Sequence, residues 1–104
     1  MNNRILVHFE FPKGNQKQYD LVWDELKAKG YEHPNGLLFH VGAPMQNGGW
    51  FVLDLWESQK AFDEFGKVLV PLIQKQGLDA QPKIMQPHLT YQNVYQMQRV
   101  GVLS

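Results

Sequence analysis

Three segments of this chain are short and rich in apolar residues that alternate with other side chains, a pattern typical of β-strands. They cover residues 4–11, 37–41 and 50–56. In two further segments large apolar residues recur every three or four positions, which predicts amphipathic helices. The first helix is expected over residues 16–29, and the second follows Ser58 and ends at Gly77.

Polar residues, glycine and proline delimit these elements. Asn15 and Ser58 are typical helix N-caps, because their side-chain oxygens accept hydrogen bonds from free backbone N–H groups. The sequence QNGG at residues 46–49 predicts a hairpin, since Gly and Asn tolerate positive φ. Pro71 lies inside the apolar stripe of the second helix, so a kink or a break is expected just before it.

The order of the elements predicts the fold class. A fourth strand is expected in the tail of residues 84–97, most convincingly over residues 89–95, with a loose end after about residue 97. The resulting β-α-β-β-α-β order, in one domain covering residues 1–104, predicts an α+β ferredoxin-like fold. This fold has a four-stranded antiparallel sheet with both helices on one face.

Side chains alternate between the two faces of a sheet, so each strand divides into two rows. We expect three apolar rows beneath the helices: Ile5, Val7, Phe9 and Phe11; Leu37, Phe39 and Val41; Phe51, Leu53 and Leu55. The opposite rows contain the ionisable residues His8, Glu10, His40 and Asp54. They also contain the apolar residues Leu6, Leu38, Trp50, Val52 and Trp56.

The second face is therefore expected to be mixed, and too apolar for a face exposed to water. A two-fold homodimer would cover it, because the same patch is buried twice. Two sheets packed in this way would enclose a cavity with His8, Glu10, His40 and Asp54 in its walls. Such a cavity would be the natural site for a small-molecule ligand.

His8 and Glu10 are two residues apart on one strand, roughly 6.6 Å along one face. They could act as a general base tuned by a carboxylate, suited to proton abstraction next to a carbonyl. They could equally form an ion pair or a hydrogen-bonded pair that lines a wet dimer interface. Both interpretations remain open.

His40 could be a second acid or base, or it could form a hydrogen bond across the dimer interface. Asp54 could orient a ligand hydroxyl beside the flat wall of Trp56, or Trp56 could pack in the dimer interface while Asp54 pairs with a nearby His or Arg. His40 could also belong to a metal set with His8, Glu10 and Asp54, although H-x-E on a strand is a weak metal signal because the spacing fixes no third ligand. We expect neither a metal nor a cofactor.

The other aromatic and histidine residues have simpler interpretations. Tyr19, Trp23 and Phe62 lie on helical apolar stripes and are expected in the core. His33 and His88 lie in or beside loops and are expected at the surface. Tyr91 and Tyr95 could cap the mouth of the pocket.

Charge and composition exclude several classes of protein. Lys and Arg number ten, as do Asp and Glu, so the formal net charge is zero and nothing favours nucleic acid or an acidic membrane. The absence of cysteine excludes disulfides, thiolate nucleophiles and zinc knuckles. The N-terminus has no apolar run longer than three residues, and no stretch approaches the roughly 18 residues of a membrane span. We therefore expect a cytoplasmic location.

Several motifs resemble those of the dimeric α/β-barrel superfamily, which includes the antibiotic-biosynthesis-monooxygenase-like and stress-responsive barrel proteins. The motifs are FEFP at the end of the first strand, QYDLVWDEL at 18–26, GLLFHVGAP at 36–44, GGWFVLDLWES at 48–58 and AFDEF at 61–65. The similarity extends from Ile5 to about Ile73. It is specific for the fold and for a subset of small bacterial members, and not for an activity.

The resemblance implies a homodimer with a barrel at the sheet–sheet interface and a pocket in each protomer. Members include cofactor-independent oxygenases, polyketide cyclases, isomerases, haem-degrading enzymes and proteins without a known reaction. The haem-degrading branch fits poorly, because His8 and Glu10 stand where that branch has an Asn on the first strand. No catalytic residue is transferred from any branch.

Three functions follow from these observations. The first is a cofactor-independent enzyme, such as a monooxygenase, cyclase or isomerase, that uses a histidine base on a small aromatic or carbonyl-rich substrate. The second is a protein that binds such a ligand without converting it. The third is a structural dimer whose polar residues only satisfy one another.

Overall fold

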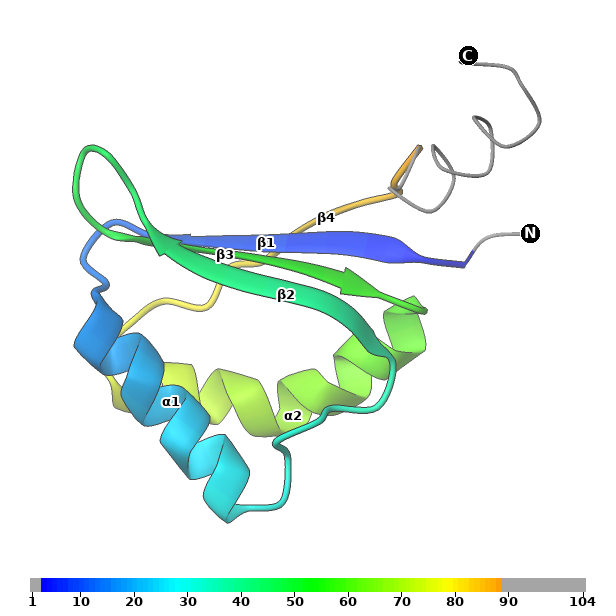
Figure 1. Ribbon diagram of the computed structural model, residues 1–104, viewed down its shortest axis with the longest axis horizontal. Coiled ribbons are helices and arrows are strands. Elements are labelled where there is room, and N and C mark those ends of the chain that lie inside the picture. The colour runs from blue at the N-terminus through cyan, green and yellow to red at the C-terminus, as the bar shows by residue number, and fades with distance from the viewer. Residues whose placement is uncertain (1–2, 89–104) are drawn as a thin grey trace, which may run out of the picture.

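The computed structural model describes residues 3–88. The elements in chain order are β1 (Ile5–Phe11), α1 (Gln16–Ala28), β2 (Leu37–Pro44), β3 (Trp50–Trp56), α2 (Gln59–Lys75) and β4 (Lys83–Met85). The strands form one antiparallel sheet in the order β2-β3-β1-β4. Both helices lie on one face of this sheet (Figure 1). The predicted α+β ferredoxin-like fold is confirmed.

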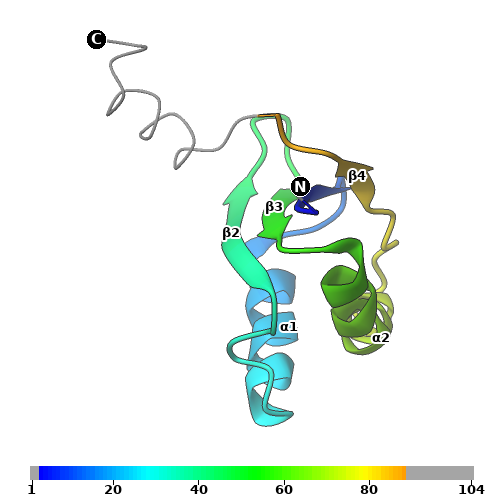
Figure 2. The ribbon, with the colours of Figure 1, turned by 90° about the vertical axis from the view of Figure 1, so that its right-hand side faces the viewer.

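The two helices lie beneath different parts of the sheet. Figure 2 shows α1 beneath the β2 side and α2 beneath the β4 side. The core lies between the helices and the sheet, with Val22 and Leu26 from α1 and Phe62 and Phe65 from α2. Neither helix within the described part of the chain is long and apolar enough to cross a membrane.

The predicted caps and the hairpin are present. The backbone N–H of Gln18 donates to Asn15 Oδ1 at 2.9 Å, and that of Ala61 donates to Ser58 Oγ at 3.1 Å. The turn between β2 and β3 has Gly48 and Gly49 at φ values of 90° and 93°. These values lie in the left-handed region, where only glycine is free of steric cost.

Helix α2 continues through Pro71, so of the two predicted outcomes, a kink or a break, the break is wrong. Buried residues on both sides of the proline, Leu69 before it and Leu72 and Ile73 after it, hold the helix against the core. Packing therefore outweighs the one backbone hydrogen bond that proline removes.

The fourth strand begins earlier than its most convincing predicted segment. Strand β4 has three residues and pairs with β1, with Leu6 opposite Met85 and His8 opposite Lys83. The strand expected over residues 89–95, Tyr91, Tyr95 and the tail after residue 97 lie outside the described residues.

The rows of β1 are as predicted, whereas those of β3 are exchanged. Ile5, Val7, Phe9 and Phe11 are buried beneath the helices. The pairing of β3 with β1 places Asp54 opposite Val7 and Val52 opposite Phe9, on the same side of the sheet. Trp50, Val52, Asp54 and Trp56 are thus buried beneath the helices, and the prediction that they lie on the other face is wrong.

Size explains this exchange. The indole of Trp56 is fully buried and packs on Phe62 and Phe65 of α2, with ring centroids 5.8 and 5.3 Å apart. Large aromatic rings fill the space between sheet and helices better than the leucines of the alternate row, and close packing favours them there.

The rows of β2 are also exchanged after its first residue. Leu37 lies opposite Trp56 and packs against the core, as predicted. A register shift between Leu37 and Phe39, of the kind a β-bulge produces, then reverses the face of the sheet to which each following side chain points. Phe39 and Val41 are therefore exposed, and His40 faces the helices opposite Asp54.

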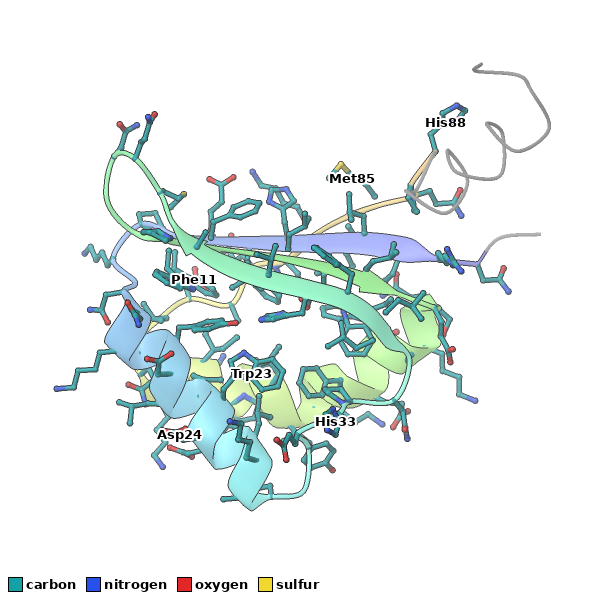
Figure 3. The ribbon with its side chains drawn as sticks, in the orientation of Figure 1. Phe11, Trp23, Asp24, His33, Met85 and His88 are labelled. Atoms are coloured by element: carbon teal, nitrogen blue, oxygen red, sulfur yellow. The ribbon has the colours of Figure 1, made fainter. Side chains whose placement is uncertain are left out.

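The face without helices is called the open face below. Its residues, placed by strand pairing, are Leu6, His8, Glu10, Phe39, Val41, Ala43, Phe51, Leu53, Leu55, Lys83 and Met85. Figure 3 shows Met85 on the side of the sheet opposite the helices. The described residues of the open face are apolar apart from His8, Glu10 and Lys83.

Candidate active site

Three polar side chains from three elements form one hydrogen-bonded chain beneath the sheet. The pairing of β2 with β3 sets His40 opposite Asp54, and His40 Nδ1 lies 2.5 Å from Asp54 Oδ1. On the other side of the imidazole, His40 Nε2 lies 2.5 Å from the hydroxyl of Tyr19 on α1. Asp54, His40 and Tyr19 are together called the relay. The predicted pairing of Asp54 with a histidine is confirmed, whereas the packing of Trp56 in a dimer interface is not, because Trp56 is buried against α2.

The hydrogen-bonding chemistry of the three side chains determines which atom of each pair in the relay is the donor. A carboxylate only accepts hydrogen bonds, so His40 Nδ1 carries a hydrogen and donates it to Asp54. The Nε2 atom of a neutral imidazole then accepts, and the Tyr19 hydroxyl donates to it. The second carboxylate oxygen of Asp54 accepts from Trp56 Nε1 at 3.3 Å. Asp54 is only 3% exposed, and these bonds offset the loss of water around it.

Tyr19 keeps its proton well above neutral pH. Burial raises the pKa of its hydroxyl above the ordinary value of 10.0, and the negative charges of Asp54 and Asp20 raise it further, against a hydrogen bond with Trp23 that lowers it. At neutral pH Tyr19 is therefore a hydrogen-bond donor. The side chain was predicted in the core and does pack against it, but its hydroxyl was missed as a site group.

Aromatic rings surround the imidazole of His40. The ring of Tyr19 is stacked at a centroid distance of 5.8 Å, and that of Trp23 meets it edge-on at 5.0 Å. Figure 3 shows Trp23 extending from α1 towards the sheet, whereas Asp24 points away from it. The His40 side chain keeps 20% of its surface exposed, and it belongs to β2, an edge strand of the sheet.

A cavity of about 50 Å³ lies beside the relay, between the sheet and both helices. Besides the relay, its lining includes Phe9, Phe11, Val22, Trp50, Val52, Phe65, Leu69 and Ile73. Its walls are almost wholly carbon, because the polar atoms of the relay are turned towards one another. In Figure 3 the side chain of Phe11 reaches from β1 towards this space.

Two more polar side chains belong to the cavity wall. Gln18 Nε2 donates to the backbone carbonyl of Gln76 at 3.2 Å, which joins the start of α1 to the end of α2. The other amide atom, Gln18 Oε1, and the indole Nε1 of Trp50 are buried without a hydrogen-bond partner among residues 3–88. Sequence reasoning did not single out Gln18.

His8 and Glu10 form a separate pair on the open face, as predicted for that face. His8 Nδ1 lies 3.8 Å from Glu10 Oε2, and the His8 ring lies beside Phe51 at 5.6 Å. The sheet separates this pair from His40 and Asp54, so the four residues do not line one cavity and cannot share one metal ion. In the described part of the chain no group of three or more His, Cys, Asp or Glu residues could hold a metal.

The residues predicted to contact a ligand do not all lie on one face of the sheet. Trp50 and Val52 line the cavity beneath the helices, and Trp56 supports Asp54 from the same side. Leu6 lies on the open face, and Leu38 is 46% exposed at the register shift of β2. His33 and His88 are exposed, as predicted.

The chain matches no family model and no curated protein. Its fold is shared with solved structures. A mutant of SnoaB, a cofactor-independent oxygenase from Streptomyces nogalater, aligns at a TM-score of 0.64 and 11% identity over 86% of this chain and 97% of its own. Rv0793 from Mycobacterium tuberculosis aligns at a TM-score of 0.60 and 12% identity over 85% and 98%.

A third structure carries the name of the antibiotic biosynthesis monooxygenases. This protein, from Caulobacter crescentus, aligns at a TM-score of 0.58 and 19% identity over 86% of this chain and 92% of its own. At these identities the likeness concerns the fold. The resemblance to antibiotic-biosynthesis-monooxygenase-like proteins is confirmed at that level.

Proposed function

We propose that this protein is a cofactor-independent enzyme in which His40 moves a proton to or from a small aromatic or carbonyl-rich molecule. The observation that carries the proposal is the relay of Asp54, His40 and Tyr19, held between the sheet and α1 beside a cavity. A histidine oriented by a buried carboxylate is a recurrent general base. The fold shared with SnoaB, a cofactor-independent oxygenase, supports the same class of chemistry.

Each member of the relay has a role in such a reaction. When an acidic C–H or O–H of the substrate replaces the Tyr19 hydroxyl at His40 Nε2, the imidazole takes the proton. Asp54 then stabilises the imidazolium, because the carboxylate already accepts from Nδ1. The Tyr19 hydroxyl, still protonated, donates a hydrogen bond to the negative oxygen that develops on the substrate.

The substrate is expected to meet the relay at the exposed side of His40. The cavity behind it has about 50 Å³, whereas a cavity that binds benzene has about 150 Å³. An aromatic ring therefore does not fit there. His40 itself is partly exposed on the edge strand β2, and the rings of Tyr19 and Trp23 beside it would contact a bound aromatic molecule.

We also propose that two copies pack through their open faces. The support is the set of large apolar residues on that face, among which Phe39 is 52% and Met85 48% exposed. A homodimer of this kind would place His8 and Glu10 in the interface and leave the relay outside it. The cytoplasmic location remains a prediction.

Proton exchange at carbon tests the proposed activity. In heavy water, the protein should accelerate deuterium uptake at the α-carbons of cyclohexanone or acetophenone, as followed by NMR. His40→Ala should reduce this acceleration roughly 100-fold, the usual contribution of a general base. His33→Ala, at an exposed loop histidine, should leave it unchanged. Equal rates for the wild type and His40→Ala would refute the proposal.

Binding without conversion is the second candidate. It is favoured by the hydrogen bonds within the relay, which satisfy its polar atoms without any substrate. Chemical-shift changes around His40 on addition of acetophenone, without deuterium uptake, would select this candidate.

A further inference from the structure

The ionisable residues of the open face are gathered in one part of it. In the described part of the chain, strands β2 and β3 contribute apolar side chains to this face: Phe39, Val41, Ala43, Phe51, Leu53 and Leu55. Strands β1 and β4 contribute His8, Glu10 and Lys83, which are together called the charged corner. Figure 2 shows β2 and β4 at opposite edges of the sheet. The open face therefore has an apolar half and a half that contains the charges.

The side chains of the charged corner do not satisfy one another. Lys83 lies directly opposite His8, where side chains on one face begin about 5 Å apart. His8 Nδ1 is buried and has no hydrogen-bond partner among residues 3–88, because Glu10 Oε2 at 3.8 Å is too distant for a hydrogen bond. Within the same residues Lys83 forms no ion pair. A protein that covers the open face must therefore supply partners for these groups, because burial of an unpaired charge is strongly unfavourable.

The division of the open face restricts where a two-fold axis can lie. In a face-to-face dimer the axis lies between the two sheets and parallel to them. An axis along the strands, through the middle of the sheet, lays β1 and β4 of one copy on β3 and β2 of the other, so each charged corner is buried against apolar side chains. The same axis moved between β1 and β4 leaves the apolar half uncovered. An axis that crosses the strands avoids both faults, because it lays the two charged corners on each other.

We propose that the two-fold axis of the dimer crosses β1 between His8 and Glu10, so that Glu10 of each copy pairs with Lys83 and His8 of the partner subunit. An axis level with Glu10 would bring the two carboxylates together, and an axis level with His8 would bring the two Lys83 ammonium groups together. Between these positions each carboxylate meets an ammonium group and an imidazole, and symmetry makes the contact twice. This arrangement rests on the dimer proposed above, and it adds which residues of the two copies meet.

Exchange of charge between two chains tests the arrangement. Glu10→Lys and Lys83→Glu, each as a single variant, place two pairs of like charges in the interface. Each should raise the dissociation constant of the dimer roughly 100-fold or more. In an equimolar mixture, each variant chain meets opposite charges on the other chain at both positions, so the mixture should sediment as a dimer. Mixing restores the pairs only if they join two chains, because a pair within one chain stays broken in the mixture.

Glu64→Lys and Lys67→Glu provide the matched control. These two residues form an ion pair at 3.3 Å on the exposed surface of α2, on the helix side of the sheet. Each control variant should therefore remain dimeric, and circular dichroism verifies that every variant is folded. If a charge-reversal variant does not fold, Glu10→Gln removes the charge alone. It should raise the dissociation constant roughly tenfold and weaken its dependence on salt.

The arrangement and the dimer fail by different results. The arrangement is overturned if the wild type is a dimer and the two charge-reversal variants stay monomeric when mixed. It is also overturned if each variant alone dimerises as tightly as the wild type. A monomeric wild type would overturn the proposed dimer, and the arrangement with it.

Discussion

Asp54 shows how a carboxylate can lie in an apolar core. Among residues 3–88, Asp54 is the one charged or polar residue that is buried. Its two oxygens accept hydrogen bonds from His40 Nδ1 and Trp56 Nε1. A buried carboxylate without such donors would cost several kcal/mol. The hydrogen bond from His40 Nδ1 also fixes the tautomer of His40. The contact that offsets the cost of burying Asp54 therefore leaves His40 Nε2 as a hydrogen-bond acceptor.

The stability of the protein is predicted to fall at strongly alkaline pH because of Tyr19. Its pKa is raised in the folded state, mainly by burial, so the folded protein holds this proton more tightly than the unfolded chain. The resulting stabilisation is complete below the ordinary pKa of 10.0 and is lost as the pH rises through the higher folded value. Denaturant unfolding at increasing pH, with tyrosinate absorbance as a second signal, measures this loss.

Tyr19→Phe is the control for this effect. Phenylalanine keeps the ring in the core and has no proton to lose, so the alkaline loss of stability should be smaller in the variant. An identical alkaline profile for the two proteins would show that Tyr19 is not responsible.

At the level of elements, the relay depends on a close approach between α1 and β2. The ring of Tyr19 lies over Gly42, where a Cβ atom would come within 2.7 Å of the ring and 3.0 Å of Trp50 Nε1. Gly42 does not have positive φ, so space and not backbone conformation requires glycine here. Tyr19 can therefore pack against the edge strand β2 because Gly42 has no side chain.

Gly42→Ala is therefore predicted to destabilise the fold by roughly 1–3 kcal/mol, the usual cost of overpacking. The added methyl group would push Tyr19 away from His40. Gly66, inside α2, has no atom within 4 Å of the position that a Cβ would take, so Gly66→Ala should instead stabilise by about 0.5–1 kcal/mol through helix propensity. Denaturant unfolding of both variants measures the difference, and a Gly42→Ala protein as stable as the wild type would contradict the close approach.

At the level of the whole molecule, the sheet separates two groups of polar side chains, one on each face. The relay and the cavity lie on the helix side, and the His8–Glu10 pair lies on the open face, where Lys83 is opposite His8. A site beneath the helices does not need a second protomer to close it. The proposed dimer and the proposed activity can therefore be tested independently.

Phe39→Glu is predicted to prevent dimer formation. Phe39 is among the most exposed large apolar residues described, and a carboxylate at its place would be buried without a partner in a sheet–sheet interface. Sedimentation should show the wild type as a dimer and the variant as a monomer. Leu21→Glu, at an exposed position on α1, should remain dimeric. A wild type that is monomeric would remove the basis for this interface.

The sequence by itself determined the elements and one face of the sheet. Periodicity and caps fixed the two helices and three strands, because these signals are local. The row of Ile5, Val7, Phe9 and Phe11 could be placed beneath the helices because its alternate row contains His8 and Glu10. His40 and Asp54 could be named as candidates from their residue types.

Only the tertiary structure decided which way β2 and β3 face. Both rows of β3 are largely apolar, so the choice depended on which rings fill the space under the helices and on whether Asp54 finds partners there. Those partners come from β2 and α1, and the register shift after Leu37 sets the phase that brings His40 opposite Asp54. Contacts between segments far apart in the chain, and not local pattern, thus placed the relay beneath the sheet.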